Sequence, residues 1–145
     1  VGKGGKIFTI YKLRSMRNDA EKNGAQWAEK DDPRITKVGK FIRLTRIDEI
    51  PQLFNILKGD MSIVGPRPER PKFTIEFNKE IPGFINRTAV KPGLTGWAQV
   101  NGGYDMSPKE KLQYDLEYIR KQSILLDIKI IFKTFKVVLT GEGAR

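Results

Sequence analysis

The chain has 145 residues, enough for one domain with a hydrophobic core and too few to predict two. Its 27 lysines and arginines against 17 acidic residues give a formal net charge of +10, which favours anionic partners such as nucleic acid, anionic lipid or phosphorylated metabolites. Because cysteine and histidine are absent, the composition excludes a disulfide scaffold and thiolate chemistry, and it leaves carboxylates, amines, hydroxyls or an oxygen-bound magnesium ion for any reaction.

The first part of the chain predicts one strand, one loop and one helix. Residues 6–13, KIFTIYKL, are β-branched and aromatic and follow a glycine-rich opening, which predicts a strand. Residues 17–34 are polar and charged and indicate a loop or a short frayed helix. In residues 35–46, apolar side chains recur at helical spacing, which predicts an amphipathic helix.

A basic stripe follows this predicted helix, because a lysine or arginine recurs at every third position. Its members are Arg34, Lys37, Lys40, Arg43 and Arg46. The stripe is either a solvated helix face or part of a site for phosphate and a metal ion, since it runs directly into two carboxylates. The sequence leaves both interpretations open.

The two carboxylates, Asp48 and Glu49, are adjacent at the predicted start of the next helix. Asp48 is a good N-cap, Pro51 then falls in the first turn, and Gly59 ends the helix. Neighbours on a helix point about 100° apart, so one carboxylate could attack a substrate while the other holds a cation. The structural alternative is an ordinary N-cap followed by an acidic residue in the first turn.

A stiff segment follows. Residues 61–64, MSIV, predict a short buried strand, and residues 65–71, GPRPERP, predict an extended segment that is not helical. Its prolines would hold Arg67 and Arg70 in place, where each guanidinium could bind a phosphate. The alternative is a surface turn with solvated arginines.

The C-terminal half predicts mainly helices. Residues 72–80 favour a helix weakly, whereas residues 107–122 predict one strongly, with Ser107 as the cap. Residues 90–103 contain several glycines around Trp97 and indicate an ordered loop or an irregular hairpin. The tryptophan would either stack on a base or sugar or attach this loop to the core.

The last segment, residues 124–139, is strongly apolar but interrupted by Asp127, Lys129, Lys133 and Lys136. It is too charged to span a bilayer, which takes about 20 consecutive apolar residues. It is either a packed helix or an amphipathic helix at a membrane interface, whose lysines suit anionic head groups. Together these elements predict an α+β fold: a single, mainly helical domain over residues 1–145 with a small β-sheet or hairpin.

Several tracts, taken in order, resemble the bacterial sugar transferase family of polyprenol-phosphate hexose-1-phosphate transferases. They are FTIYKLRSM, DDPRITKVGKFIR, RIDEIPQLFNILKGDMSIVGPRPERP, KPGLTGWAQVNG and the final GEGA. The resemblance implies transfer of a sugar 1-phosphate from a UDP-sugar to undecaprenyl phosphate, with release of UMP and a requirement for Mg²⁺. It also implies a role in starting exopolysaccharide, capsule or O-antigen chains.

The resemblance implies roles for individual residues. Asp48 would be the nucleophile that forms a covalent phosphosugar intermediate, and Glu49 would act in catalysis with the magnesium ion. Arg43 and Arg67 would bind phosphates. The basic residues Lys40 and Arg70 are further phosphate-binding candidates.

Members of this family carry an N-terminal hydrophobic helix that dips into the membrane and returns. The sequence begins at Val1 without such a helix or an initiator methionine, so we expect the catalytic portion of a monotopic enzyme at the cytoplasmic face of the bacterial plasma membrane. Two alternatives are a basic nucleic-acid-binding module and a non-catalytic membrane scaffold for glycan assembly. We rank both below the transferase and expect no nucleic acid as a partner, because the aromatic residues alternate with apolar ones as in a core.

Overall fold

The computed structural model describes residues 1–103 and 106–141. Most of the final GEGA tract therefore lies outside the described residues. Six α-helices are described: α1 (Lys37–Leu44), α2 (Gln52–Leu57), α3 (Pro71–Glu80), α4 (Trp97–Gly102), α5 (Pro108–Lys121) and α6 (Ile124–Thr140). Two strands and three 3₁₀ turns complete the described elements: β1 (Ser62–Val64), β2 (Gly93–Thr95), η1 (Lys3–Gly5), η2 (Ile47–Glu49) and η3 (Phe84–Ala89). The predicted class, a mainly helical α+β domain with a small sheet, is confirmed.

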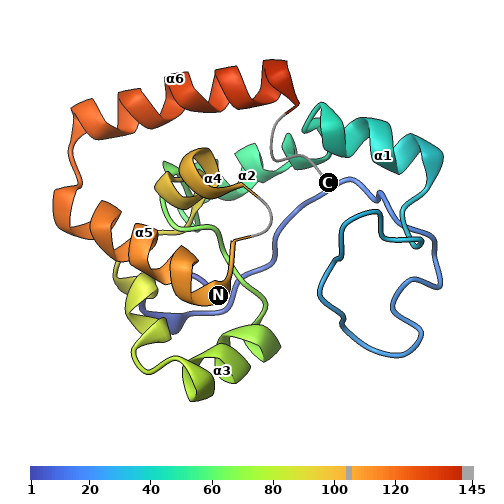
Figure 1. Ribbon diagram of the computed structural model, residues 1–145, viewed down its shortest axis with the longest axis horizontal. Helices are drawn as coiled ribbons and strands as arrows, with labels where there is room; N and C mark the ends of the chain where they lie inside the picture. The colour runs from blue at the N-terminus through green and yellow to red at the C-terminus, as the bar shows by residue number, and fades with distance from the viewer. Residues whose placement is uncertain (104–105, 142–145) are drawn as a thin grey trace.

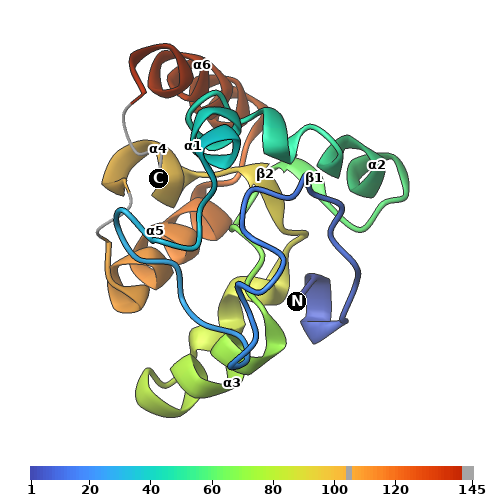
Figure 2. The ribbon, with the colours of Figure 1, turned by 90° about the vertical axis from the view of Figure 1, so that its right-hand side faces the viewer.

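The sheet consists of two parallel strands near the middle of the molecule (Figure 2). Ser62 pairs with Gly93, and Val64 pairs with Thr95. The predicted strand at 61–64 is confirmed, but the predicted loop or hairpin over 90–103 is wrong. Residues 93–95 pair with a strand far upstream in sequence, and the residues from Trp97 form α4.

Two glycines explain why this segment is not a hairpin. A Cβ atom on Gly93 would lie 2.0 Å from the backbone nitrogen of Gly65, and one on Gly65 would lie 2.4 Å from the carbonyl oxygen of Lys91. The glycines therefore allow two chain segments to approach closely. From local sequence alone, a glycine in such a close contact cannot be distinguished from a glycine in a turn.

The predicted strand over residues 6–13 is also wrong. These residues form an extended strap that pairs with no strand in the described structure. The fully buried side chain of Asn55 donates a hydrogen bond to the Thr9 carbonyl and accepts one from the Tyr11 amide. Leu13 N–H donates to the Asp48 carbonyl. An amide side chain and one main-chain group thus replace a sheet ladder.

The helix predicted over 35–46 is confirmed as α1, with Thr36 accepting a hydrogen bond from the Gly39 amide as its N-cap. The N-cap predicted at Asp48 is wrong. Asp48 lies inside η2, which follows the left-handed residue Arg46 (φ 58°), and α2 begins only after Pro51. Gly59 follows the end of α2 with φ 85°, so the predicted stop is confirmed.

The C-terminal helices confirm their predictions, because α5 is capped by Ser107 and α6 by Ser123. The core cluster of Val64, Tyr118 and Ile130 lies between the sheet and these two helices. Trp97 packs against this cluster, so it attaches its segment to the core. In Figure 1, α6 runs across the top of the molecule and α5 descends on its left side.

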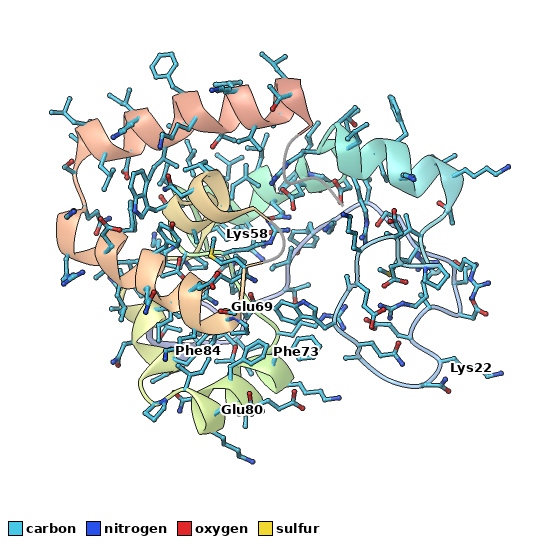
Figure 3. The ribbon with its side chains drawn as sticks, viewed as in Figure 1. Lys22, Lys58, Glu69, Phe73, Glu80 and Phe84 are labelled. Carbon is cyan, nitrogen blue, oxygen red and sulfur yellow. The ribbon has the colours of Figure 1, made fainter. Side chains whose placement is uncertain are left out.

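Residues 17–34 form the predicted loop, which projects at the right of Figure 1. Trp27 attaches this loop to α3 through edge-to-face contacts with Phe73 and Phe77, at ring-centre distances of 5.2 and 5.3 Å. Lys22 lies on the outer part of the loop and points away from the helices (Figure 3).

Candidate active site

The two adjacent carboxylates of η2, Asp48 and Glu49, are both buried. Asp48 is 2% exposed and Glu49 is 7% exposed. The neighbouring side chains of Ile47 and Ile50 are exposed on the surface. Buried carboxylates need charge partners or hydrogen bonds, and both have cationic partners here.

Lys12 is the cation that lies against Asp48. Its ammonium is 3.2 Å from Asp48 Oδ2 and 3.9 Å from Glu49 Oε1. The strap brings it there, since the amide of Leu13 is bonded to the Asp48 carbonyl. One ammonium therefore faces both carboxylates.

Glu49 is held by two arginines from different elements. Arg67 NH2 donates a hydrogen bond to Oε1, and Arg46 NH1 lies 3.6 Å from Oε2. Burial alone would raise the pKa of Glu49. The surrounding cations, Arg67 first, outweigh burial and hold the pKa below its ordinary value. Glu49 is therefore ionised at neutral pH.

Arg67 projects from the proline-rich segment between β1 and α3, as the sequence predicts. Its own carbonyl accepts a hydrogen bond of 2.8 Å from Arg87 NH2. Arg87 is itself paired with Asp115, whose Oδ2 lies 2.7 Å from the same NH2. Burial raises the pKa of Asp115 despite the opposing charge of Arg87. This pair thus lies behind Arg67, on the side of its main chain.

The structure brings together three of the predicted site residues, namely Asp48, Glu49 and Arg67. The other three have no ion pair with the two carboxylates in the described part of the chain. Arg43 donates from Nε to Ser15 Oγ at 2.7 Å, and Arg70 pairs with Glu21 on the surface. Lys40 is exposed on α1. The phosphate-binding roles of these three residues stay predictions.

Three cations at or behind this site were not among the predicted site residues. Arg46 belongs to the predicted basic stripe, so the sequence contained a signal for it. Lys12 and Arg87 reach the site only through the fold, from the strap and from η3, and no local pattern distinguishes them from other basic residues.

The site can be compared with what Mg²⁺ requires. The described residues hold no group of three or more acidic, histidine or cysteine side chains that could bind a metal ion. Asp48 and Glu49 supply two carboxylates, and Mg²⁺ is commonly bound by one or two carboxylates together with substrate phosphates and water. The residues therefore fit a magnesium ion that shares its ligands with a phosphate substrate.

This arrangement suits chemistry on phosphates. An ionised carboxylate can act as a nucleophile without a histidine base. Lys12, Arg46 and Arg67 surround the two carboxylates with excess positive charge, which would offset the charge of an anionic substrate.

Comparison with known proteins shows which family this chain resembles. Residues 1–141 match the family model described as bacterial sugar transferase. An Aeromonas hydrophila protein named UDP-N-acetylgalactosamine-undecaprenyl-phosphate N-acetylgalactosaminephosphotransferase is 51% identical over 148 residues, which cover 100% of this chain and 35% of that protein. A Xanthomonas campestris protein named UDP-glucose:undecaprenyl-phosphate glucose-1-phosphate transferase is 48% identical, covering 99% of this chain and 31% of that protein.

A Salmonella typhimurium protein named undecaprenyl-phosphate galactose phosphotransferase is 41% identical, covering 99% of this chain and 33% of that protein. The chain thus spans about a third of the length of these relatives. The family model covers nearly all of the sequence, and the relatives match it from end to end. The chain therefore belongs to the bacterial sugar transferase family.

Proposed function

We propose that this chain transfers a sugar 1-phosphate from a UDP-sugar to undecaprenyl phosphate and releases UMP. The observation that carries the proposal is the contact of the buried Asp48 carboxylate with Lys12, beside a Glu49 that two arginines hold. The family and the names of the relatives support transfer of a sugar phosphate to undecaprenyl phosphate.

The transfer takes two steps, both at one phosphorus atom. In the first, an Asp48 oxygen attacks the phosphorus that carries the sugar, and the bond to the bridging oxygen breaks. The electron pair leaves with UMP, and an aspartyl phosphosugar remains. In the second, an oxygen of undecaprenyl phosphate attacks the same phosphorus, breaks its bond to Asp48 and restores the carboxylate. Neither step needs a proton acceptor, because both nucleophiles are anions.

The cations around the two carboxylates have distinct roles in this proposal. Lys12 would bind the phosphate oxygens as they approach Asp48, and Arg67 would stabilise the charge that develops during transfer. Glu49 would hold Mg²⁺, which supplies further neutralisation of the diphosphate when bound. Arg43, Lys40 and Arg70 would extend the phosphate-binding surface.

We also propose that the chain lies on the cytoplasmic surface of the plasma membrane, where it meets the lipid acceptor. The support is the outer face of α6, whose large apolar side chains are exposed. They are Ile124, Leu125, Ile128, Phe132, Phe135 and Leu139, whose solvent-exposed fractions are 79, 80, 45, 70, 63 and 86% in that order. The ammonium groups of Lys129 and Lys133 lie over the Trp97 ring, 5.6 and 5.0 Å from its centre.

The apolar surface continues from the C-terminal end of α6 onto α1, which lies beyond that end at the right of Figure 1. A Cβ atom on Gly141, just after α6, would lie 3.3 Å from the Leu44 side chain. Val38, Phe41 and Leu44 of α1 are 71, 59 and 50% exposed. An apolar surface of this extent marks a contact with lipid or protein. Within the described residues, no helix is both long enough and apolar enough to cross a bilayer. With their large apolar side chains exposed, α6 and α1 would lie along the membrane surface.

UMP release tests the reaction. The whole protein in nanodiscs is given Mg²⁺, undecaprenyl phosphate and, in turn, UDP-glucose, UDP-galactose and their N-acetylated counterparts. We expect release of UMP with one of these donors and none with the Asp48→Asn variant. Release that persists in Asp48→Asn contradicts the proposed nucleophile, and an Asp48→Asn protein that retains the wild-type unfolding temperature excludes misfolding as the cause of a loss.

A further inference from the structure

A buried ion pair lies behind the candidate site. Arg87 of η3 is 5% exposed and Asp115 of α5 is 1% exposed. Two nitrogens of the guanidinium, Nε and NH2, lie 2.8 and 2.7 Å from Asp115 Oδ2. Removing two charges from water is costly, and a buried pair often contributes little to stability compared with apolar residues of the same size. The pair therefore calls for a further role.

The second contact of Arg87 indicates that role. Its NH2 group also donates a hydrogen bond of 2.8 Å to the main-chain carbonyl of Arg67. The guanidinium of Arg67 in turn contacts Glu49. A continuous series of contacts thus joins Asp115 to Arg87, Arg87 to the main chain of Arg67, and Arg67 to the acidic pair.

The main chain around Arg67 is held from several sides, and Arg87 is the group that holds the Arg67 carbonyl itself. Pro66 and Pro68 flank it and have no amide hydrogen to donate. Gly65 N–H donates to the Thr95 carbonyl and fixes the segment on the side of the sheet. The Pro66 carbonyl accepts a hydrogen bond of 2.9 Å from Gly93 N–H, and the Glu69 carbonyl accepts one of 2.7 Å from the amino group of Val1. Between them, the Arg67 carbonyl is bonded to Arg87. The Glu69 carboxylate also faces this region, with Oε1 4.0 Å from Arg87 NH1 and 3.3 Å from the Lys111 ammonium.

We infer that Arg87 and Asp115 are positioning residues that hold Arg67 against Glu49. Asp115 orients the planar guanidinium, and the guanidinium holds the carbonyl of Arg67. Neither residue contacts Asp48 or Glu49 in the described part of the chain, so both act through Arg67. The inference rests on the proposed function only for its effect on turnover, because the placement of Arg67 can be measured separately.

The informative variant is Arg87→Lys in the whole protein. Lysine keeps the charge opposite Asp115, but a single ammonium cannot reproduce the flat fork that spans a carboxylate and a carbonyl. Arg34→Lys is the matched control. Arg34 also joins a buried aspartate, Asp32, to main-chain carbonyls, those of Ala20 and Trp27, in the loop and away from the carboxylate pair.

Two readouts are needed. A structure of the Arg87→Lys protein shows whether the Arg67 guanidinium still contacts Glu49. Turnover of the UDP-sugar is measured for Arg87→Lys, for Arg67→Ala and for the double variant. We expect the contact to be lost, and kcat to fall about tenfold with little change in KM, which is the size of effect that one hydrogen bond supports. In the Arg67→Ala background, Arg87→Lys should have no further effect.

The possible outcomes distinguish a failure of the positioning role of Arg87 from a failure of the proposed function of Arg67. If Arg67 stays against Glu49 in Arg87→Lys, or if the two losses in turnover multiply, the positioning role is overturned. An equal loss of turnover in Arg34→Lys would also overturn it, because a general effect on folding would then explain the result. If Arg67→Ala retains full turnover, the proposed function of Arg67 fails, and the structure of Arg87→Lys still decides whether Arg87 positions it.

Discussion

At Asp48, one ammonium group faces the carboxylate that we propose as the nucleophile. The lysine that supplies it, Lys12, is partly exposed and lies on the strap. When a diphosphate approaches Asp48, its oxygens compete with the carboxylate for this ammonium. Lys12 would thus neutralise the buried Asp48 carboxylate before the substrate binds and the substrate's phosphate oxygens afterwards.

Replacing this lysine tests its role. We expect Lys12→Met to lower kcat/KM by about a hundredfold, the usual effect of removing one preorganised donor from a developing anion. The measurement is UMP release by the whole protein at several donor concentrations. Lys22→Met, the same change on the exposed outer loop, is the control and should leave kcat/KM unchanged. Equal activities of the two variants would contradict a role for Lys12.

The ionisation of Glu49 predicts how stability depends on pH. Its pKa in the folded chain is lower than the ordinary value of 4.5, so its charge contributes stability that is fully present above pH 4.5. That contribution is lost as the pH falls through the lower, folded-state pKa. We expect the difference in unfolding free energy between wild type and Glu49→Gln to be constant from neutral pH to about pH 5.

Below that range the difference should shrink, because the wild-type Glu49 side chain becomes neutral like the glutamine of the variant. Urea unfolding at a series of pH values measures it. A difference that grows on acidification would show that the cations around Glu49 do not stabilise its ionised form.

At the scale of elements, α6 is a helix whose outward side is its apolar side. Ile130 is fully buried and Thr134 bonds to Thr95, while the exposed positions carry large apolar side chains. The sequence showed the periodicity of this helix but not which side would face the protein. Lysines commonly face water, and here the ammonium groups of two of them also lie over the indole of Trp97.

This orientation predicts how the 145-residue chain binds lipid. We expect Phe132→Ser and Leu139→Ser each to reduce partitioning onto anionic phospholipid vesicles about tenfold, since burial of one large apolar side chain is worth at least 1.5 kcal/mol. Sedimentation with vesicles measures the bound fraction. The unfolding temperature should change little, because both side chains are exposed.

Ile130→Ser provides the contrast, because it removes a fully buried side chain from the same helix and should lower the unfolding temperature. Vesicle binding that is unaffected by the two exposed substitutions would exclude the outer face of α6 as the lipid contact.

Other elements show where sequence patterns suffice and where they fail. The helix starting at Pro108 was predictable because its cap, its proline and its apolar spacing are all local. The extended residues 6–13 have the composition of a strand, but their hydrogen-bond partner is the side chain of Asn55. Strand 93–95 was missed because its partner is distant in sequence. In both cases the deciding contact is non-local.

For the molecule as a whole, the acidic pair and Arg67 were predictable because they belong to one continuous tract and to a family resemblance. Their surroundings were not. Lys12, Arg87 and Asp115 come from three other parts of the chain and meet the site only when the domain has folded. The charge and spacing of residues within a short stretch of sequence do not show which distant residues will be in contact after folding.

The Arg87–Asp115 pair also sets a time at which the site can be complete. Lys12, the acidic pair and Arg67 are synthesised before Arg87, and all of them before Asp115. While α5 is still inside the ribosome, Arg87 lacks the Asp115 carboxylate that orients its guanidinium toward the Arg67 carbonyl. At a synthesis rate of about 5–20 residues per second, the emerging chain carries the proposed nucleophile for several seconds before Asp115 is available to orient Arg87.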